Sequence, residues 1–382
     1  MNSSSNDPTR RDFLHQVGAT IAAAGAASAG LSSLALGQNS PSTQSDDRKA
    51  GYAMVGLGSF CLNQLIPGFA AAKKSKLVAL VSGHPDKAKR IAEQHGVAAK
   101  NIYNYDNYDS IKDNPEVDVI YIVLPNCMHA EYVIRGAKAG KHIMCEKPMA
   151  VSVEECQAMV DACKAANRKL MIGYRSQYEP HNLRAIQMIR DGQIGKLITI
   201  VADAGFMMRD PTVWRLNKKL AGGGPLMDIG IYALQACRYL SGEEPIEINA
   251  MTHTTPDDPR FKEVEETCAW QMRFPSGVLA NCTTSYNYSG QNRHRAVGTT
   301  GSIDMEPATG YGGNKLTLHA RGKPPELIDI ADISQFAAEM DHFSDCVLNN
   351  KTPKTPGEEG LRDVRLMMAI YEAAASGKTV KV

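Results

Sequence analysis

Short apolar runs alternate with helical patterns between residues 51 and 173. Five apolar runs predict buried strands: 53–55, 76–82, 117–124, 142–145 and 169–174. Segments with helical character lie between them, at 62–74, 85–95 and 153–167, and 101–111 predicts a short strand and a turn. Because alternating strands and helices are typical of a parallel sheet, we expect an α/β Rossmann domain over residues 51–173.

The pattern changes after residue 174, where strands begin to dominate. Helices are predicted at 182–191, from the glycines at 222–224 to about 240, and at 333–348 and 357–376. Strands are predicted at 196–204, 246–253, 267–274, 278–286, 294–299, 302–305 and 315–320. Turns such as Pro275-Ser276-Gly277 separate them. We therefore expect an α+β domain at 174–382 with a large, mostly antiparallel open sheet.

A glycine turn follows the first strand. Gly56 allows a tight turn, and Gly58 lets the backbone approach a pyrophosphate at the N-terminus of the next helix. Cys61 replaces the third glycine of the usual pattern, and a purely structural turn is equally open on the motif alone. The βαβ unit completed by strand 76–82 favours a dinucleotide site. The candidate contacts here are Gly56, Leu57, Gly58, Ser59 and Phe60.

The end of the second strand indicates which dinucleotide is bound. Ser82, Gly83 and His84 stand where an acid normally binds the ribose 2′-hydroxyl, and Lys87 follows. No carboxylate repels a 2′-phosphate there, so we predict NADP rather than NAD. Lys87, and the basic residues at 89 and 90, can alternatively form a solvated helix face.

Two later strand ends carry candidate chemistry. The third long strand ends in Leu124-Pro125-Asn126, and His129 either lies beside the cofactor or caps the following helix. The next strand ends in Glu146-Lys147-Pro148. A lysine at a strand end beside a nucleotide fingerprint is well placed for chemistry, although an isolated Lys-Pro pair usually marks a surface turn.

A third cluster follows the glycines at 222–224. Asp228 and Tyr232 are four residues apart and share one face of the predicted helix. They form either a proton-handling pair or a buried tyrosine with its hydrogen-bonded acid.

Composition narrows the class of protein. The chain has 382 residues and a formal net charge of +1, which gives no footprint for a nucleic acid. Nine cysteines form no CxxC pair, and we expect Cys145, Cys156 and Cys163 to be buried thiols. We assign no metal ligand.

The first residues predict an export signal. Arg10 and Arg11 form a twin-arginine pattern, followed by a segment at 17–36 rich in Ala, Gly and Ser. We expect a signal peptide at 1–37, cleaved after Gly37, a polar linker at 38–50 and a periplasmic product free of the membrane. A membrane anchor is the alternative, but strong hydrophobes are few.

These motifs together resemble the glucose-fructose oxidoreductase, inositol dehydrogenase and MocA family over everything after the linker. The core of the resemblance is Gly56-Leu57-Gly58, Glu146-Lys147-Pro148 and the glycines at 222–224 with Asp228. Tyr232, where most of the family has histidine, and segments 67–69, 80–83, 144–149, 214–216, 242–247 and 307–311 look like the glucose-fructose oxidoreductase subgroup. Ser59-Phe60 and Ser176-Gln177 depart from it, which leaves the sugar open.

The resemblance implies a tightly bound NADP, sugar substrates and a homo-oligomer, dimer or tetramer, assembled through the open sheet face. It implies that Lys147, Asp228 and Tyr232 are catalytic. The other cofactor contacts in this picture are Tyr105, Glu146, Arg175, Trp214, Arg215 and Tyr311, and the sugar also meets Tyr178 and Tyr311.

The expected reaction passes a hydride from C1 of an aldose to a second sugar carbonyl, either ketose or aldose, by a ping-pong route. Tyr232 is the expected base, assisted by the charge of Lys147, and Asp228 is expected to orient the sugar or the lysine. The alternatives are an NADP-dependent aldose dehydrogenase that exchanges its cofactor, a nicotinamide-dependent glycosidase, and a non-catalytic sensor of sugars or dinucleotides.

Overall fold

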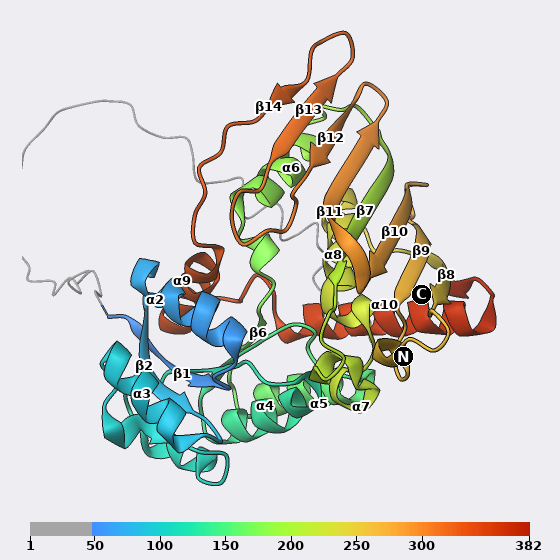
Figure 1. Cartoon of the computed structure of the whole chain (residues 1–382). Helices are drawn as coiled ribbons and strands as arrows, with labels where there is room; N and C mark the ends of the chain where they lie inside the picture. The colour runs from blue at the N-terminus through green and yellow to red at the C-terminus, as the bar shows by residue number, and fades with distance from the viewer. Residues whose placement is uncertain (1–47) are drawn as a thin grey trace, which may run out of the picture. The chain divides into compact units, whose positions relative to one another are not determined.

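A six-stranded parallel sheet forms the first layer of the protein over the described residues (Figure 1). The computed structural model describes residues 48–382, so the predicted export signal and nearly all of the linker lie outside them. The strands follow the order β3-β2-β1-β4-β5-β6. Their bounds are β1 Ala50–Val55, β2 Ser75–Val81, β3 Ile102–Tyr103, β4 Val119–Ile122, β5 His142–Cys145 and β6 Leu170–Ile172. This order is that of a Rossmann sheet, whose direction of winding reverses between β1 and β4.

Helices α2 Ile66–Ala71, α3 Pro85–His95, α4 His129–Lys138 and α5 Val153–Ala165 accompany this sheet. The predicted single helix at 62–74 is divided into a π-helical turn, Cys61–Leu65, and α2. Pro67 follows the π-helical turn within one continuous helix, so its missing N–H removes one donor from the helical hydrogen bonds there. All six residues of β1 and all four of β4 are buried, as expected for central strands of a parallel sheet.

Helix α9, Gln335–Leu348, packs against this sheet from the far end of the chain. Phe336, Met340 and Phe343 share one apolar core with Tyr52 and Met54 of β1. The Tyr52 hydroxyl also donates a hydrogen bond to the carbonyl oxygen of Met340 at 2.8 Å. Figure 1 shows α9 beside α2. The predicted division of the chain at residue 173 misses this helix, because an amphipathic pattern does not reveal which layer its apolar face covers.

A nine-stranded sheet forms the second layer over the described residues, in the order β14-β13-β12-β11-β7-β10-β9-β8-β15. Its strands are β7 Leu197–Met207, β8 Glu247–His253, β9 Thr267–Arg273, β10 Leu279–Ser285, β11 Asn287–Gly298, β12 Gly301–Met305, β13 Leu316–Ala320, β14 Glu326–Leu327 and β15 Val380–Lys381. Only the pair of β7 and β10 is parallel, so the predicted mostly antiparallel sheet is confirmed. The two short edge strands, β14 and β15, were not predicted.

Helices cover one face of this second sheet. They are α6 Pro180–Arg190, α8 Ile231–Ser241 and α10 Gly357–Ser376, with a π-helical turn at Leu226–Gly230 before α8. The short helix α7 Lys218–Ala221 lies instead against the loop that follows β4. Trp270 and Met272 of β9 are buried on the covered side, whereas Met251 and Leu279 are exposed on the open side. Buried and exposed side chains therefore alternate along these strands, as in an antiparallel sheet with one face in solvent.

Buried ions connect α8 to α10. Arg238 is fully buried and pairs with Asp363, Glu359 and Glu244. A buried guanidinium needs this many acceptors, because an unpaired buried charge is costly. The network holds in place the helix that carries Tyr232 in its first turn.

All nine cysteines are free thiols, and eight of them are buried, which confirms the prediction for Cys145, Cys156 and Cys163. Within residues 48–382, no helix is both long enough and apolar enough to cross a membrane.

The packing of α9 yields a stability prediction. Phe343→Ala should lower the free energy of unfolding by about 3–5 kcal/mol, because it removes a fully buried ring between α9 and the first sheet. Urea unfolding measures this difference. The control Ile333→Ala, at a side chain 48% exposed just before the helix, should change it by less than about 0.5 kcal/mol. Equal effects of the two changes would contradict this packing.

Candidate functional site

The predicted cofactor residues of the first domain lie at the carboxyl ends of β1, β2, β4 and β5, which meet at one edge of the parallel sheet. Gly56 has φ +93°, and a Cβ there would lie 2.4 Å from the carbonyl oxygen of Val123. Gly58 is exposed, and a Cβ on it would meet nothing within 4 Å. The helical hydrogen bonds begin at once, with Leu62 N–H donating to the Gly58 carbonyl. The turn therefore fits a pyrophosphate close to the backbone at a helix N-terminus.

The end of β2 supplies a second group of predicted contacts. Ser82 is buried and its hydroxyl accepts a hydrogen bond from the His84 N–H at 3.1 Å. A Cβ on Gly83 would lie 3.0 Å from the ring of Tyr105. Burial raises the pKa of the Cys61 thiol to about 12, and the charge of Lys87 opposes this shift. Lys87 is partly buried on α3, whereas the basic residues at 89 and 90 are exposed there.

The structure corrects the prediction for His129. This side chain is fully buried, with Nε2 2.9 Å from the carbonyl oxygen of Leu124 and Nδ1 3.0 Å from that of Pro148. It therefore ties the loop after β4 to the loop after β5, and it neither lies at the cofactor nor caps α4. Asn126 in the same loop donates from Nδ2 to the Ala221 carbonyl at 2.8 Å, which links the loop to α7.

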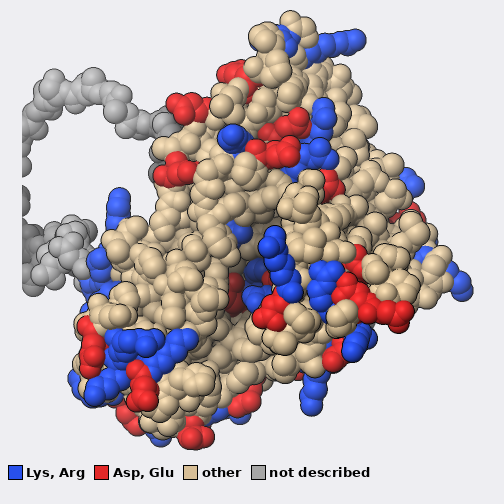
Figure 2. Space-filling model, in the orientation of Figure 1, with Lys and Arg blue, Asp and Glu red and all other residues tan. Residues whose placement is uncertain are grey.

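Lys147, Asp228 and Tyr232, the three predicted catalytic residues, meet at one place. Lys147 Nζ donates to the main-chain oxygen of Asp228 at 2.5 Å and lies 3.3 Å from its Oδ1. The same ammonium lies 4.8 Å from the centre of the Tyr232 ring. Lys147 lies two residues after β5 and precedes Pro148, whose peptide bond is cis. In Figure 2, basic and acidic side chains gather around a hollow near the middle of the visible face.

Electrostatics keep Lys147 and Asp228 charged. Burial of Asp228 opposes its charge, but Lys147, Arg215 and the hydroxyl of Tyr286 outweigh it and lower the Asp228 pKa. Burial also disfavours the Lys147 ammonium, yet Tyr232, Asp228 and Glu146 raise the Lys147 pKa. The site therefore holds a buried ion pair at neutral pH.

Arg175 contacts the Tyr232 hydroxyl directly. Its Nε donates to Tyr232 Oη at 3.0 Å, while Nη1 donates to Gln335 Oε1 at 2.7 Å and Nη2 to the Thr309 carbonyl at 2.7 Å. The guanidinium also lies 4.7 Å from the ring centres of both Tyr232 and Tyr311. The cation in direct contact with the phenol oxygen is therefore Arg175, whereas sequence reasoning had given the assisting charge to Lys147.

Aromatic residues, of which Tyr311 is exposed, border the charged group. Tyr311 is 52% exposed, and its ring lies 6.0 Å from that of Phe60 and 5.4 Å from that of Phe336. Trp214 stacks on Arg215 at 4.6 Å, and Arg215 Nε lies 3.2 Å from Asp228 Oδ2. Tyr311, Phe60, Trp214 and Arg215 are thus placed around the predicted catalytic residues.

Tyr178, predicted to contact the sugar, lies elsewhere. It is 8% exposed, its ring packs against His342, and its hydroxyl lies 3.3 Å from Thr355 Oγ1. It belongs to the apolar core beneath the first sheet, so this prediction is wrong. The family resemblance suggested the contact, but the short turn at Arg175–Gln177 directs the side chains of Arg175 and Tyr178 to different partners.

Two groups were missed by sequence reasoning. The Tyr286 hydroxyl donates to Asp228 Oδ2 at 3.0 Å. The only sequence signal at Tyr286 is its place at the end of the predicted strand 278–286. Glu339 of α9 lies near Glu146, and both take part in contacts with the Tyr121 hydroxyl, at 3.4 and 2.6 Å. Burial raises the pKa of both carboxyls, most strongly that of Glu339. No sequence signal connects Glu339 to Glu146, because the two residues are about 190 positions apart, a span far longer than any local motif.

Within residues 48–382, no group of three or more His, Cys, Asp or Glu side chains is arranged to hold a metal ion.

Comparisons with known proteins agree with this geometry. Residues 50–174 match the model of an oxidoreductase family with an NAD-binding Rossmann fold, GFO/IDH/MocA, and residues 182–304 match the C-terminal domain of the same family. The structure resembles an aldose-aldose oxidoreductase from Caulobacter crescentus, with a TM-score of 0.86, 48% identity, and 88% of this chain and 100% of that chain covered.

Two curated relatives are named as sugar dehydrogenases. An NADP-dependent D-xylose 1-dehydrogenase of Haloarcula marismortui is 32% identical over 88% of this chain and 94% of its own length. A second NADP-dependent D-xylose 1-dehydrogenase, of Haloferax volcanii, is 26% identical over 87% of this chain and 99% of its own.

The hydrogen bond from Tyr286 to Asp228 predicts a pH effect. Asp228 has a lowered pKa in the folded state, so its stabilising contribution is present above about pH 4, the unfolded value, and is lost as the pH falls through the folded pKa. Tyr286→Phe should raise the folded pKa and reduce the stability at pH 7. The difference from the native protein should shrink below about pH 4.

Urea unfolding at a series of pH values measures this effect. Tyr288→Phe is the control, because Tyr288 lies two residues later at the start of β11 and makes no hydrogen bond to Asp228. A stability difference that is the same at every pH would contradict the assigned hydrogen bond.

Proposed function

Because the chain belongs to the GFO/IDH/MocA family of oxidoreductases, we propose that it transfers hydride between two sugars through an NADP that stays bound. The donor is an aldose oxidised at C1 to its lactone, and the acceptor is the carbonyl group of a second sugar, reduced to an alditol. The observation that carries the proposal is the Tyr232 hydroxyl, bonded to Arg175 with the Lys147 ammonium over its ring.

Residues at the four strand ends would hold the dinucleotide. The backbone at Gly56, Gly58 and Ser59 would receive the pyrophosphate, and Ser82 and Lys87 would receive a 2′-phosphate, which supports NADP over NAD. When bound, the nicotinamide supplies the place where a hydride is accepted from the first sugar and returned to the second.

Tyr232 is the base for the C1 hydroxyl of the donor. The Arg175 Nε–H donates to the phenol oxygen and would stabilise negative charge on it during proton transfer. Lys147 adds a second positive charge over the ring. In the second half of the cycle, the same hydroxyl returns its proton to the alkoxide oxygen of the acceptor, so no net proton leaves the site.

Asp228 positions Lys147, and both of its carboxylate oxygens have partners. Oδ1 faces Lys147, and Oδ2 faces Arg215 and Tyr286. Its negative charge is therefore compensated locally. This arrangement supports a role in orienting the ammonium and the sugar rather than in taking the proton.

An NADP-dependent aldose dehydrogenase that exchanges its cofactor is the second candidate. The named activity of the Haloarcula marismortui relative favours it. The higher identity to the aldose-aldose oxidoreductase favours transfer between sugars and, among acceptors, an aldose.

We further propose that the protein is exported to the periplasm by the twin-arginine route and works there as a homo-oligomer. The pattern at Arg10 and Arg11 supports export, and a scarcity of free NADP outside the cytoplasm would favour a cofactor recycled within the enzyme. Met251, 74% exposed, and Leu279, 45% exposed, lie on the open sheet face and support a second copy there.

Bound NADP can be tested on protein purified through gel filtration without added nucleotide. Glucose alone should cause a rise in absorbance at about 340 nm that stops after one turnover, and a second sugar should abolish it. A panel of ketoses and aldoses then identifies the acceptor. A rise that requires added NADP would support the exchanging dehydrogenase instead.

Tyr232→Phe should lower the rate of this first reduction by about 10²- to 10⁴-fold, because the base is lost while the dinucleotide contacts remain. Stopped-flow absorbance measures the rate, and the nucleotide content of the purified variant measures retention. Tyr288→Phe again serves as the control. A nearly normal rate in the Tyr232→Phe variant would exclude Tyr232 as the base.

A further inference from the structure

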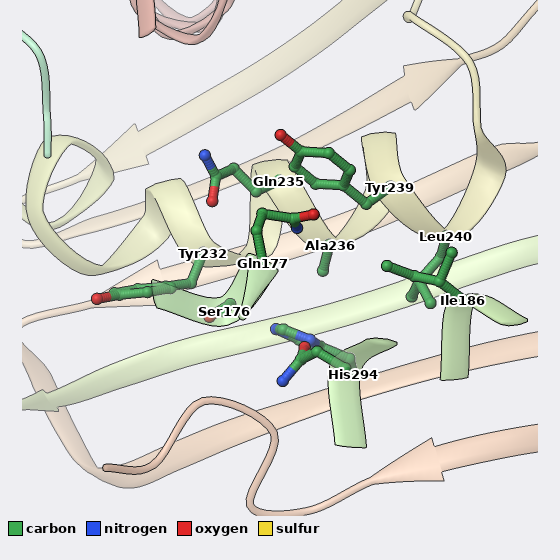
Figure 3. Close-up of a pocket in the computed structure, with 10 residues that line it drawn as sticks. Ser176, Gln177, Ile186, Tyr232, Gln235, Ala236, Tyr239, Leu240 and His294 are labelled. Atoms are coloured by element: carbon green, nitrogen blue, oxygen red, sulfur yellow. The ribbon is translucent and has the colours of Figure 1, made fainter. Parts of the chain in front are cut away.

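A small polar pocket lies behind Tyr232, between α6, α8 and the second sheet (Figure 3). The turn at Arg175–Gln177 contributes Ser176 and Gln177 to it, and β11 contributes His294. The remaining lining residues come from α6 and α8: Asn182, Ile186, Tyr232, Gln235, Ala236, Tyr239 and Leu240. In Figure 3 the Tyr232 hydroxyl points away from His294, so the pocket lies against the back of the catalytic ring.

Four polar atoms in this pocket have no hydrogen-bond partner among residues 48–382. They are Ser176 Oγ, Gln177 Oε1, and both ring nitrogens of His294. The three residues are 7%, 4% and 2% exposed, respectively. Buried polar groups in folded proteins nearly always have a partner, either protein or ordered water.

The other polar residues of the pocket are already bonded. Asn182 donates from Nδ2 to Glu179 and to the Ala308 carbonyl, and Gln235 donates to Asp363. The unpartnered atoms are therefore confined to the turn on one side and to the strand on the other. All three residues that carry these atoms line the same pocket.

Size and charge identify the ligand. The free volume is about 10 Å³, which holds about one water molecule and excludes a sugar. Burial lowers the pKa of His294 to about 4, so at neutral pH the ring offers one N–H donor and one acceptor nitrogen. The lining therefore suits a neutral molecule that both donates and accepts, as water does.

We propose that this pocket holds one ordered water molecule. The water forms hydrogen bonds with His294 and with Ser176 or Gln177, and so anchors the turn at Arg175–Gln177 to β11. Arg175 begins the same turn and donates to Tyr232 Oη. His294 is then a positioning residue for Arg175. Its effect on catalysis depends on the proposed function, whereas the water site does not.

The sign of a stability change tests the water site. If the pocket is dry, His294→Leu removes two unsatisfied polar atoms and should stabilise the protein. If water is present, His294→Leu should lower the thermal unfolding midpoint by about 2 °C or more. His294→Gln, which retains a donor and an acceptor, should restore at least half of that loss. A midpoint for His294→Leu equal to or above that of the native protein would overturn the proposal.

Crystallography of the unaltered protein gives a second, independent test that does not require a variant to fold. At high resolution, density for a water molecule should lie within hydrogen-bonding distance of a His294 ring nitrogen and of Ser176 Oγ or Gln177 Oε1. A pocket without such density would overturn the proposal.

Single-turnover kinetics test the positioning role. The rate of nicotinamide reduction should fall several-fold in His294→Leu, with little change in the sugar concentration needed for half-maximal rate, and His294→Gln should recover most of it. If His294→Leu lowers the unfolding midpoint but leaves the rate unchanged, the water site is supported and the positioning role of His294 is overturned. Absence of reduction in the unaltered protein would count against the proposed function and leave the water site untouched.

Discussion

The contact between the Lys147 ammonium and Asp228 is the interaction on which the site depends. It joins the end of β5 in the first sheet to the π-helical turn that precedes α8 in the second layer. Because the ammonium bonds the main chain as well as the carboxylate, it fixes the start of α8 and so the position of Tyr232 one turn later. Charge compensation by Arg215 and Tyr286 lets the pair remain ionised although it is largely buried.

Arg175 provides a second constraint on the tyrosine, through its hydroxyl. Its three donor nitrogens connect Tyr232 to Gln335 of α9 and to the carbonyl oxygen of Thr309. The phenol is thus contacted by two cations, Lys147 over its ring and Arg175 at its oxygen and ring. Preorganised charges of this kind need no rearrangement when charge develops on the phenol oxygen.

Local sequence patterns were sufficient for most strands of both sheets and for three candidate site residues that the structure brings together. Lys147, Asp228 and Tyr232 could be found because each stands close to a glycine or proline motif at the end of an element. His129 and Tyr178 were misassigned because their neighbours in sequence line the site while their own side chains face the interior. Tyr286 and Glu339 could not be found, because only the tertiary fold brings them to Asp228 and Glu146.

The position of α9 has a consequence for how the protein is made. One face of β1 is covered by Phe336, Met340 and Phe343, yet the ribosome releases these residues long after the strands of the first sheet. A nascent chain that carries the complete Rossmann sequence would still expose the apolar face around Tyr52 and Met54. Chaperones bind exposed apolar surfaces of this kind. The core of the first domain can therefore be completed only after α9 has been synthesised. Folding of this domain thus requires nearly the whole polypeptide.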